Sequence, residues 1–335
     1  MRDDGDRTIT TVAFDYKKII RSRQTRERLL RALSWVPDRV MVELQYRIKT
    51  GRKLDLDDPR RFTEKLQWMK LFYRDRLMNR CADKACVREY VEECGLGKLL
   101  VPLVGVFERD SSIDFGRFPD RFVLKDSLGG GGNDVLICRD KSSFDVERAR
   151  SEMARWTAPG RHAKHPGREW VYDCPGSSKV LVEEFIESSR GGSMLEFKFF
   201  CFDGFPAYLY VLGDRALGKG VKLGIFAVAD FERVDAWRAD EERLADPVAK
   251  PACYEAMVEA ARTLSAPFPH ARIDFYLVSD DEFRFSEITF FDGSGYFLYE
   301  PDGFDFEMGS FFTLPKGGTD EPRRHVHEQQ RGISR

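Results

Sequence analysis

Apolar residues keep helical spacing over the N-terminal part of the chain. Between residues 15 and 50 they recur at helical intervals among many arginines and lysines, with an interruption near Pro37. A second helical region is predicted from Pro59 through RFTEKLQWMKLFYRD. A third begins at Asp83 and closes on Gly95, a residue suited to the end of a helix. This part of the chain is therefore expected to be mainly helical.

From Val101 onward the pattern changes to short apolar runs separated by turn residues. Two helical segments, residues 145–156 and 252–265, fall between these runs. Because some runs are joined by hairpin turns such as Asp203-Gly204, we predict an α+β fold with mixed or antiparallel sheets. The predicted strands are residues 121–125, 134–138, 179–186, 196–202, 207–212, 271–278 and 283–290.

Composition narrows the class of protein. The 335 residues, of which 42% are hydrophobic and 33% charged, are enough for two domains or subdomains with a sizeable core. A net charge of -2 gives no positive field, so nucleic acid is not expected as a partner. No segment reads as a secretory leader or a transmembrane span, and we expect a cytoplasmic protein. The seven cysteines lack CxxC spacing and are expected to be reduced thiols.

The predicted strand FRFSEITF, residues 283–290, contains a glutamate that its alternation does not explain. Phe283, Phe285, Glu287 and Thr289 fall on one side of a regular strand. The preceding predicted strand offers a reason, since SDDE, residues 279–282, has the length of a hairpin connection. If Val278 lies opposite Phe283, the facing pairs are Tyr276 and Phe285, Asp274 and Glu287, and Arg272 and Thr289.

Two carboxylates, those of Asp274 and Glu287, would then lie across from each other. Like charges at facing positions, with Cβ atoms about 5 Å apart, destabilise a sheet. A divalent cation such as Mg²⁺ shared with phosphate would compensate them, and so would a lysine or arginine. A structural salt bridge to Arg272 is as compatible with these residues as a metal site.

The segment RFVLKDSLGGGGNDVLIC contains the glycine run Gly129, Gly130, Gly131 and Gly132. Backbone N–H groups of such a run can wrap a phosphate without obstruction by side chains. No GK[ST] follows, and the next element is a strand, so neither a P-loop nor a dinucleotide fingerprint is present. We interpret the run as a phosphate flap between hairpin strands, with Lys125 at the end of the first strand. An ordinary hairpin tip is the alternative.

The segment KVLVEEFI is an apolar strand with an acidic end. Backbone groups left free after Glu183 and Glu184 are suited to bind a purine, and Glu196 is suited to the two ribose hydroxyls. Lys198 lies on the same strand face as Glu196 and would reach phosphate. Surface charges are the alternative for each of these side chains.

With these pieces in order, the chain resembles the ATP-grasp superfamily and, within it, the TupA-like group named for teichuronopeptide biosynthesis. The resemblance runs from about Pro59 to Pro315. The segments that carry it are EKLQWMKLFYRD, ADKACVREYV, VPLVGVF, FVLKDSLGGGGNDVLIC, REWVY, VLVEEFI, EFKFFCFDG, ARIDFYLV and SEITFFDGSGYF.

The resemblance implies an ATP-grasp fold, in which two α+β subdomains clamp ATP beneath the glycine lid. We accordingly expect a helical region over residues 1–80, a subdomain with the lid over 81–182, and a subdomain with the adenine hinge and metal acids over 183–315. Residues 316–335 are polar and rich in turn formers, and are expected to be a disordered tail.

The resemblance also implies roles for individual residues. Thr289 is the third metal residue that the resemblance implies, and it stands where many ATP-grasp ligases have asparagine, a stronger metal ligand. Backbone N–H groups of the DGSG turn would face an oxyanion. The remaining implied roles are nucleotide binding by Lys84, Lys125 and the lid glycines, an adenine hinge at Glu183, Glu184, Phe185 and Ile186, ribose binding by Glu196, phosphate contact by Lys198, metal binding by Asp274 and Glu287, and stabilisation of the transferring phosphoryl group by Arg272.

The activity implied is that of an ATP- and Mg²⁺-dependent carboxylate–amine ligase that works through an acyl-phosphate. Its partners would be a small-molecule carboxylate and an amine, of amino-acid, peptide or uronic-acid type, and a homo-oligomer is left open. Arg215, with Arg168, Trp170 and Tyr172, is a candidate for the acceptor pocket. The alternatives are a phosphotransferase to a hydroxyl and a glycosyltransferase, whose DxD spacing occurs only at Asp55-Leu56-Asp57.

Overall fold

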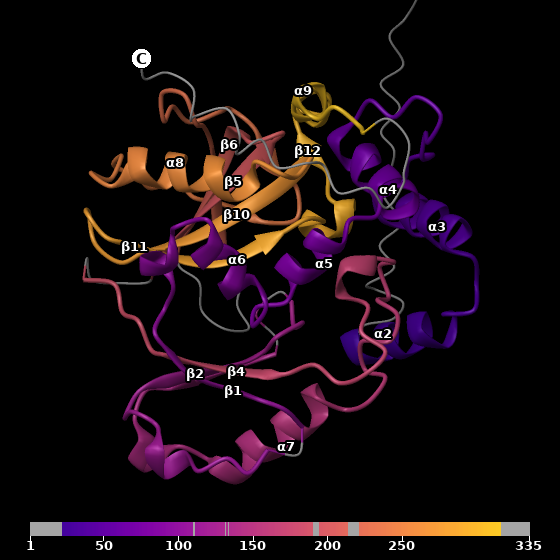
Figure 1. Ribbon diagram of the computed structural model, residues 1–335. Helices are drawn as coiled ribbons and strands as arrows, with labels where there is room; N and C mark the ends of the chain where they lie inside the picture. The colour runs from indigo at the N-terminus through magenta and orange to yellow at the C-terminus, as the bar shows by residue number, and fades with distance from the viewer. Residues whose placement is uncertain are drawn as a thin grey trace, which may run out of the picture.

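The computed structural model describes residues 22–109, 111–130, 132, 134–189, 194–213 and 221–315 (Figure 1). Gly131, Arg215 and the expected tail at 316–335 lie outside these residues. In the described part of the chain, every helix is too short or too polar to cross a membrane. The helices are α2 (Arg23–Ala32), α3 (Asp38–Thr50), α4 (Phe62–Phe72), α5 (Arg76–Ala82), α6 (Val87–Glu93), α7 (Val146–Trp156), α8 (Tyr254–Ser265) and α9 (Gly303–Phe311).

Two sheets, one antiparallel and one mixed, organise the chain, as the pattern of apolar runs predicts. The larger has the strand order β11-β10-β5-β6-β7-β9 and the smaller the order β1-β4-β2-β3. Only the pairing of β7 with β9 is parallel among the described strands. The strands are β1 (Leu103–Phe107), β2 (Phe122–Asp126), β3 (Val135–Cys138), β4 (Val180–Glu184), β5 (Leu195–Phe202), β6 (Phe205–Gly213), β7 (Lys222–Ala227), β8 (Trp237–Arg238), β9 (Glu242–Arg243), β10 (His270–Leu277), β11 (Phe283–Thr289) and β12 (Tyr299–Glu300).

Each sheet has its own hydrophobic core. In Figure 1 the larger sheet lies in the upper half beside α8, and the smaller sheet lies below it with α7 on its outer side. Residues of α4, α5 and α6 belong to the core of the larger sheet, whereas the smaller core is built from residues 113–182. The division at residue 81 stays a prediction, and the helices on both sides of it share the larger core.

The two faces of the larger sheet differ in chemistry. One face packs on α8, as the Phe199 and Tyr254 rings show with centroids 6.1 Å apart. The other face is aromatic at one end, where Phe200 and His270 surround Phe62 of α4. Towards β11 the same face becomes charged, because alternation directs Lys198 and its neighbours to that side. This face of the sheet therefore packs on α4 at its apolar end, and its charged side chains gather at the other end.

A β-bulge changes the expected alternation of β11. Arg272 pairs with Thr289 and Asp274 with Glu287, so the predicted facing of the two acids is confirmed. The register then shifts, and Phe285 pairs with Phe275 instead of the expected Tyr276. The predicted common face for Phe285 and Glu287 is therefore wrong. Ser286 is the extra residue, and it turns Glu287 from the hydrophobic face to the charged face of the sheet.

Candidate active site

Lys84 connects the two sheets at the polar end of the larger one. The residue follows α5, where Asp83 accepts hydrogen bonds from the Ala85 N–H at 2.7 Å and the Ser127 hydroxyl at 3.0 Å. Nζ of Lys84 donates to the Gly129 carbonyl at 2.5 Å and lies 3.3 Å from Oε2 of Glu287. The predicted nucleotide lysine, the glycine run and the second acid are thus neighbours in space.

Asp274 is fully buried between two cations. Nε and Nη2 of Arg272 donate to its two oxygens at 2.8 and 2.7 Å, and Nζ of Lys198 also donates to it. Nζ of Lys198 lies 2.9 Å from Oε2 of Glu196, the predicted ribose acid. Burial would lower the pKa of Lys198, but Asp274 and Glu196 raise it above its ordinary value. Lys198 therefore stays charged throughout the physiological range.

Glu287 is the more accessible of the two facing acids, with 30% of its side chain exposed. Nη2 of Arg272 lies 3.6 Å from its Oε1, on the side away from Lys84. Burial would raise the pKa of Glu287, but three nearby cations, led by Lys84, lower it to about 2. The carboxylate is therefore ionised at any physiological pH, the form in which a carboxylate binds a cation.

Asp292 is a site residue that sequence reasoning missed. It lies in the 3-10 helix η5 (Asp292–Gly295) and accepts a hydrogen bond from Nη1 of Arg272. Nη2 of the same guanidinium also donates to Thr289 Oγ1 at 3.1 Å. Burial would lower the pKa of Arg272, but Asp274 and Asp292 raise it well above its ordinary value. The available signal was the DGSG segment itself, whose aspartate follows the second acid by five residues.

Lys125 is held between the sheets. Its Nζ donates to Oε2 of Glu183 at 2.6 Å and lies 5.8 Å from the Tyr276 ring of the larger sheet. Glu183 also accepts from Nη1 of Arg88 at 2.9 Å. Burial would lower the pKa of Lys125, but Glu183 and Tyr276 raise it above its ordinary value. The side chain of Lys125 is therefore charged, and it lies between the smaller sheet and the larger sheet that carries the acids.

The expectation of free backbone groups at the predicted adenine hinge is only partly right. The Glu184 N–H donates to the Pro102 carbonyl at 3.0 Å, and the Phe185 N–H donates to the Arg121 carbonyl at 3.3 Å. These donors are used because the hinge crosses beside β1 and the segment before β2. The N–H groups of Glu184 and Phe185 are therefore not free to bind a purine, and the rest of the predicted hinge stays a prediction.

The glycine run lies between the hairpin strands β2 and β3, as predicted. Gly129 is tightly enclosed, since a Cβ there would lie 2.8 Å from the Cβ of Asp134. Gly132 has φ +70°, a conformation that favours glycine. Gly130 is open, and a Cβ there would meet nothing within 4 Å. The run is therefore tightly packed at Gly129 and has open space beside Gly130.

The donor set fits a magnesium ion that is shared with phosphate. Within the residues that the structure describes, no three His, Cys, Asp or Glu side chains form a preassembled metal cluster. Mg²⁺ commonly takes one or two carboxylates and completes its shell with phosphate and water. Glu287 supplies an accessible carboxylate, whereas both oxygens of Asp274 and the hydroxyl of Thr289 accept hydrogen bonds from Arg272.

The aromatic and basic residues proposed for an acceptor pocket are only partly suited to it. Arg168 is buried and donates to the Leu33 carbonyl at 2.8 Å, so it braces the N-terminal helices. The guanidinium of Arg74 lies 5.0 Å from the centroid of the Trp170 ring. Tyr172 lies among the charges of the site, and burial with the charge of Glu169 raises its pKa well above its ordinary value.

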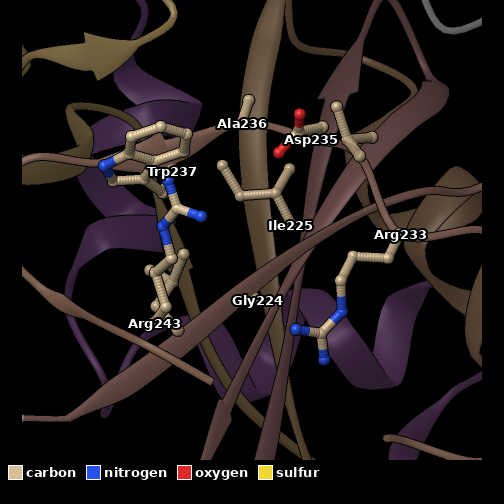
Figure 2. Close-up of a pocket in the computed structure, with 9 residues that line it drawn as sticks. Gly224, Ile225, Arg233, Asp235, Ala236, Trp237 and Arg243 are labelled. Atoms are coloured by element: carbon tan, nitrogen blue, oxygen red, sulfur yellow. The ribbon is translucent and has the colours of Figure 1, made fainter. Parts of the chain in front are cut away.

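A separate hollow of about 170 Å³ lies beside β7 and β8 (Figure 2). The Arg243 guanidinium stacks on Trp237, 3.1 Å from the ring centroid, and Arg233 lies across from them. Both terminal nitrogens of Arg233 donate to backbone carbonyls. None of the predicted site residues lines this hollow, which is distinct from the acid and lysine cluster.

Sequence comparison agrees with this geometry. The TupA-like ATP-grasp family model matches residues 64–313, which include every element that carries the cluster. The chain belongs to the TupA-like ATP-grasp family. Its α+β architecture, with a glycine loop above one sheet and paired acids on the other, is therefore the ATP-grasp fold of that family. No curated protein matches the chain.

Solved structures similar to this TupA-like chain are distant. The D-alanine–D-alanine ligase of Bacillus anthracis is 16% identical, with a TM-score of 0.38, 63% of this chain covered and 57% of that one. The D-alanine–D-alanine ligase of Helicobacter pylori is 18% identical, with a TM-score of 0.40 and coverage of 70% and 61%. The chain thus spans about three fifths of the length of these two proteins.

Proposed function

We propose that this TupA-like protein is an ATP-dependent carboxylate–amine ligase that forms an amide through an acyl-phosphate. The observation that carries the proposal is the convergence of Lys84, Lys198 and Arg272 on two facing acids beneath a glycine loop. Phosphoryl transfer is catalysed mainly by positioning and charge stabilisation, and this cluster supplies both.

The chain's own residues have distinct tasks in this reaction. Lys84 and Lys125 would hold the nucleotide phosphates, Glu196 the ribose, and the hinge at residues 183–186 the adenine. Arg272 would neutralise charge on the transferring phosphoryl group, with its guanidinium oriented by Asp274 and Asp292. Glu287 would hold Mg²⁺, and Asp274 would join it by exchanging a hydrogen bond from Arg272 or Lys198 for the ion. The ion when bound screens the charge between the phosphates.

The substrates are proposed to be small molecules, a carboxylate of amino-acid, peptide or uronic-acid type and an amine. The glycosyltransferase alternative finds no added support in the DxD segment. Oδ1 of Asp55 accepts hydrogen bonds from the N–H groups of Asp57 and Asp58, both at 3.0 Å, so the DxD segment closes a local turn. Its geometry favours a structural role.

Product analysis tests the proposal. The full chain with Mg-ATP is supplied with pools of carboxylic acids and amines, and ADP, phosphate and condensed products are measured. A ligase releases ADP and phosphate only when both an acid and an amine are present. A phosphorylated acceptor with no free phosphate would instead identify a phosphotransferase and contradict the ligase.

A further inference from the structure

A buried cluster of polar side chains lies directly behind the DGSG turn. Lys70 of α4 is 1% exposed, and its Nζ donates to the Ser294 carbonyl at 2.7 Å and to Ser294 Oγ at 3.0 Å. Ser294 Oγ in turn donates to Oε1 of Glu169, which is itself 5% exposed. The three side chains form a continuous chain of hydrogen bonds from ammonium to hydroxyl to carboxylate.

The backbone is arranged to hold the serine in this place. Ser294 has φ +60°, a left-handed conformation that costs free energy for any residue but glycine. Nε2 of Gln67 donates to the Ser294 and Gly295 carbonyls, both at 2.9 Å, which fixes the turn from below. A Cβ at position 167 would lie 2.5 Å from Ser294 Oγ, so Gly167 permits the approach of Glu169.

This cluster borders the proposed reaction centre. Asp292, two residues before Ser294, binds the Arg272 guanidinium. Tyr172 lies within the electrostatic reach of both Glu169 and Glu287, which together with burial raise its pKa. The turn therefore contacts the phosphoryl-transfer cluster at one end and the buried relay of hydrogen bonds at the other.

Several titratable and charged groups surround the relay. Burial lowers the pKa of Lys70 to about 7, with Glu169 opposing that shift. Burial also lowers the pKa of His165, whose Nδ1 lies 3.6 Å from Oε1 of Glu169. Lys49, whose Nζ lies 4.2 Å from the centroid of the Tyr296 ring, adds a further positive charge at this side. A base must lie within hydrogen-bond reach of the proton that it takes, and Glu169 meets this condition for the Ser294 hydroxyl.

We propose that Ser294 and Glu169, with Ser294 positioned by Lys70, form the relay that deprotonates the ammonium group of the amine substrate. This inference rests on the proposed ligase function. One ammonium proton passes to Ser294 Oγ as the hydroxyl proton passes to Glu169. The neutral amine then attacks the acyl carbon, the carbon–oxygen bond to phosphate breaks, and the departing phosphate takes the electron pair and the second proton.

Hydroxylamine separates this role from a structural one, because it is largely unprotonated at neutral pH and attacks an acyl-phosphate without prior deprotonation. For the carboxylate identified by the product screen, hydroxamate formation and amide formation are measured side by side. We expect Glu169→Gln and Ser294→Gly to slow amide formation about 100-fold. Hydroxamate formation should stay within about twofold of the natural protein, since the acyl-phosphate still forms.

The glycine variant removes the hydroxyl and keeps the positive φ available, so it preserves the turn. Raising the pH should restore amide formation in both variants, because a larger fraction of the amine is then neutral. Tyr296→Phe is the matched control, since the Tyr296 hydroxyl is buried in the same region without a hydrogen-bond partner among the described residues. The rates of amide formation and of hydroxamate formation should both stay unchanged in the Tyr296→Phe variant.

Equal losses of hydroxamate and amide in the Glu169 and Ser294 variants, or no loss of either, would overturn the relay while leaving the ligase intact. A natural protein that makes no hydroxamate with any carboxylate would overturn the ligase proposal, and the relay with it. The two failures are therefore distinguished by the behaviour of the unaltered chain.

Discussion

The ammonium of Lys84 lies 3.3 Å from the carboxylate of Glu287. The same ammonium donates to the carbonyl of Gly129, so one side chain joins the base of the glycine loop to the second acid. A cation in this position holds the loop near the acids. Mg-ATP would replace this contact, since its phosphates attract Lys84 and its metal attracts Glu287.

Replacing Lys84 with methionine should loosen the glycine loop and weaken Mg-ATP binding. A charge-assisted hydrogen bond contributes about 1.5–3 kcal/mol, so we expect about a tenfold or greater rise in the Kd for Mg-ATP. Hydrogen exchange of the backbone at residues 127–130 should become faster in the same variant. Lys98→Met, at an exposed lysine, is the control and should change neither measurement. Unchanged exchange in the Lys84 variant would show that it does not restrain the loop.

Glu287→Gln should abolish turnover of Mg-ATP and leave the protein folded. The substitution keeps the volume of the side chain and removes the charge that a divalent cation requires. Electrostatic stabilisation by a bound metal amounts to several kcal/mol, so a loss of at least about 100-fold is expected. Turnover is measured as ADP release, and folding by thermal unfolding. Glu282→Gln, in the hairpin before β11, is the matched control, and equal activity in the two variants would remove the metal role.

Deleting Ser286 tests the importance of the bulge. Without this residue, β11 would alternate regularly, and either Glu287 or the buried Phe285 would move to the wrong face of the sheet. We expect a loss of stability on the order of 3 kcal/mol, together with loss of Mg-ATP binding measured by calorimetry. Ser286→Ala keeps the bulge and should bind Mg-ATP normally. A deletion variant with natural stability would show that the bulge is not required.

The sequence was sufficient to predict seven of the strands and the facing of the two acids, because alternation and hairpin length are local properties. It did not predict β1 or β7, which take part in none of the hairpins that the apolar runs indicated. The bulge was not predictable, since it depends on how both strands pack against the hydrophobic core on one face. The pairing of Asp274 with Glu287 was predicted correctly because two errors in the assumed register cancel. The hairpin places Leu277, not Val278, opposite Phe283, which shifts the register by one residue, and the bulge at Ser286 shifts it back before the acids.

The contacts that organise the site could not be predicted from local patterns, because they join residues that are far apart in the sequence. Lys70 and Ser294 are separated by 224 residues, and Ser294 and Glu169 by 125. No spacing rule connects side chains that meet only when helix, loop and sheet are assembled. The hydrogen bonds donated by the N–H groups of Glu184 and Phe185 were not predicted for the same reason, because their acceptors come from other segments.

His270 should make the fold sensitive to acid. Its ring is fully buried among aromatic side chains, its Nδ1 lies 3.0 Å from the Cys201 carbonyl oxygen, and its Nε2 has no partner among the described residues. Burial lowers the pKa of His270 from 6.5 to about 4, so the folded protein keeps the ring neutral while the unfolded chain protonates it. Its contribution to stability is therefore full above pH 6.5 and is lost as the pH falls towards 4.

Denaturant unfolding of the natural protein and of His270→Phe at pH 7.5 and pH 4.5 measures this contribution. The pKa difference corresponds to about 3 kcal/mol of stability, most of which the natural protein should lose between the two conditions. The phenylalanine variant should be less stable at pH 7.5 by about 1 kcal/mol, because the Cys201 carbonyl loses its partner. Between pH 7.5 and pH 4.5, the free energy of unfolding of the variant should fall less than that of the natural protein, and the difference should equal the histidine contribution. Parallel declines in the two proteins would show that His270 is not the group that responds to acid.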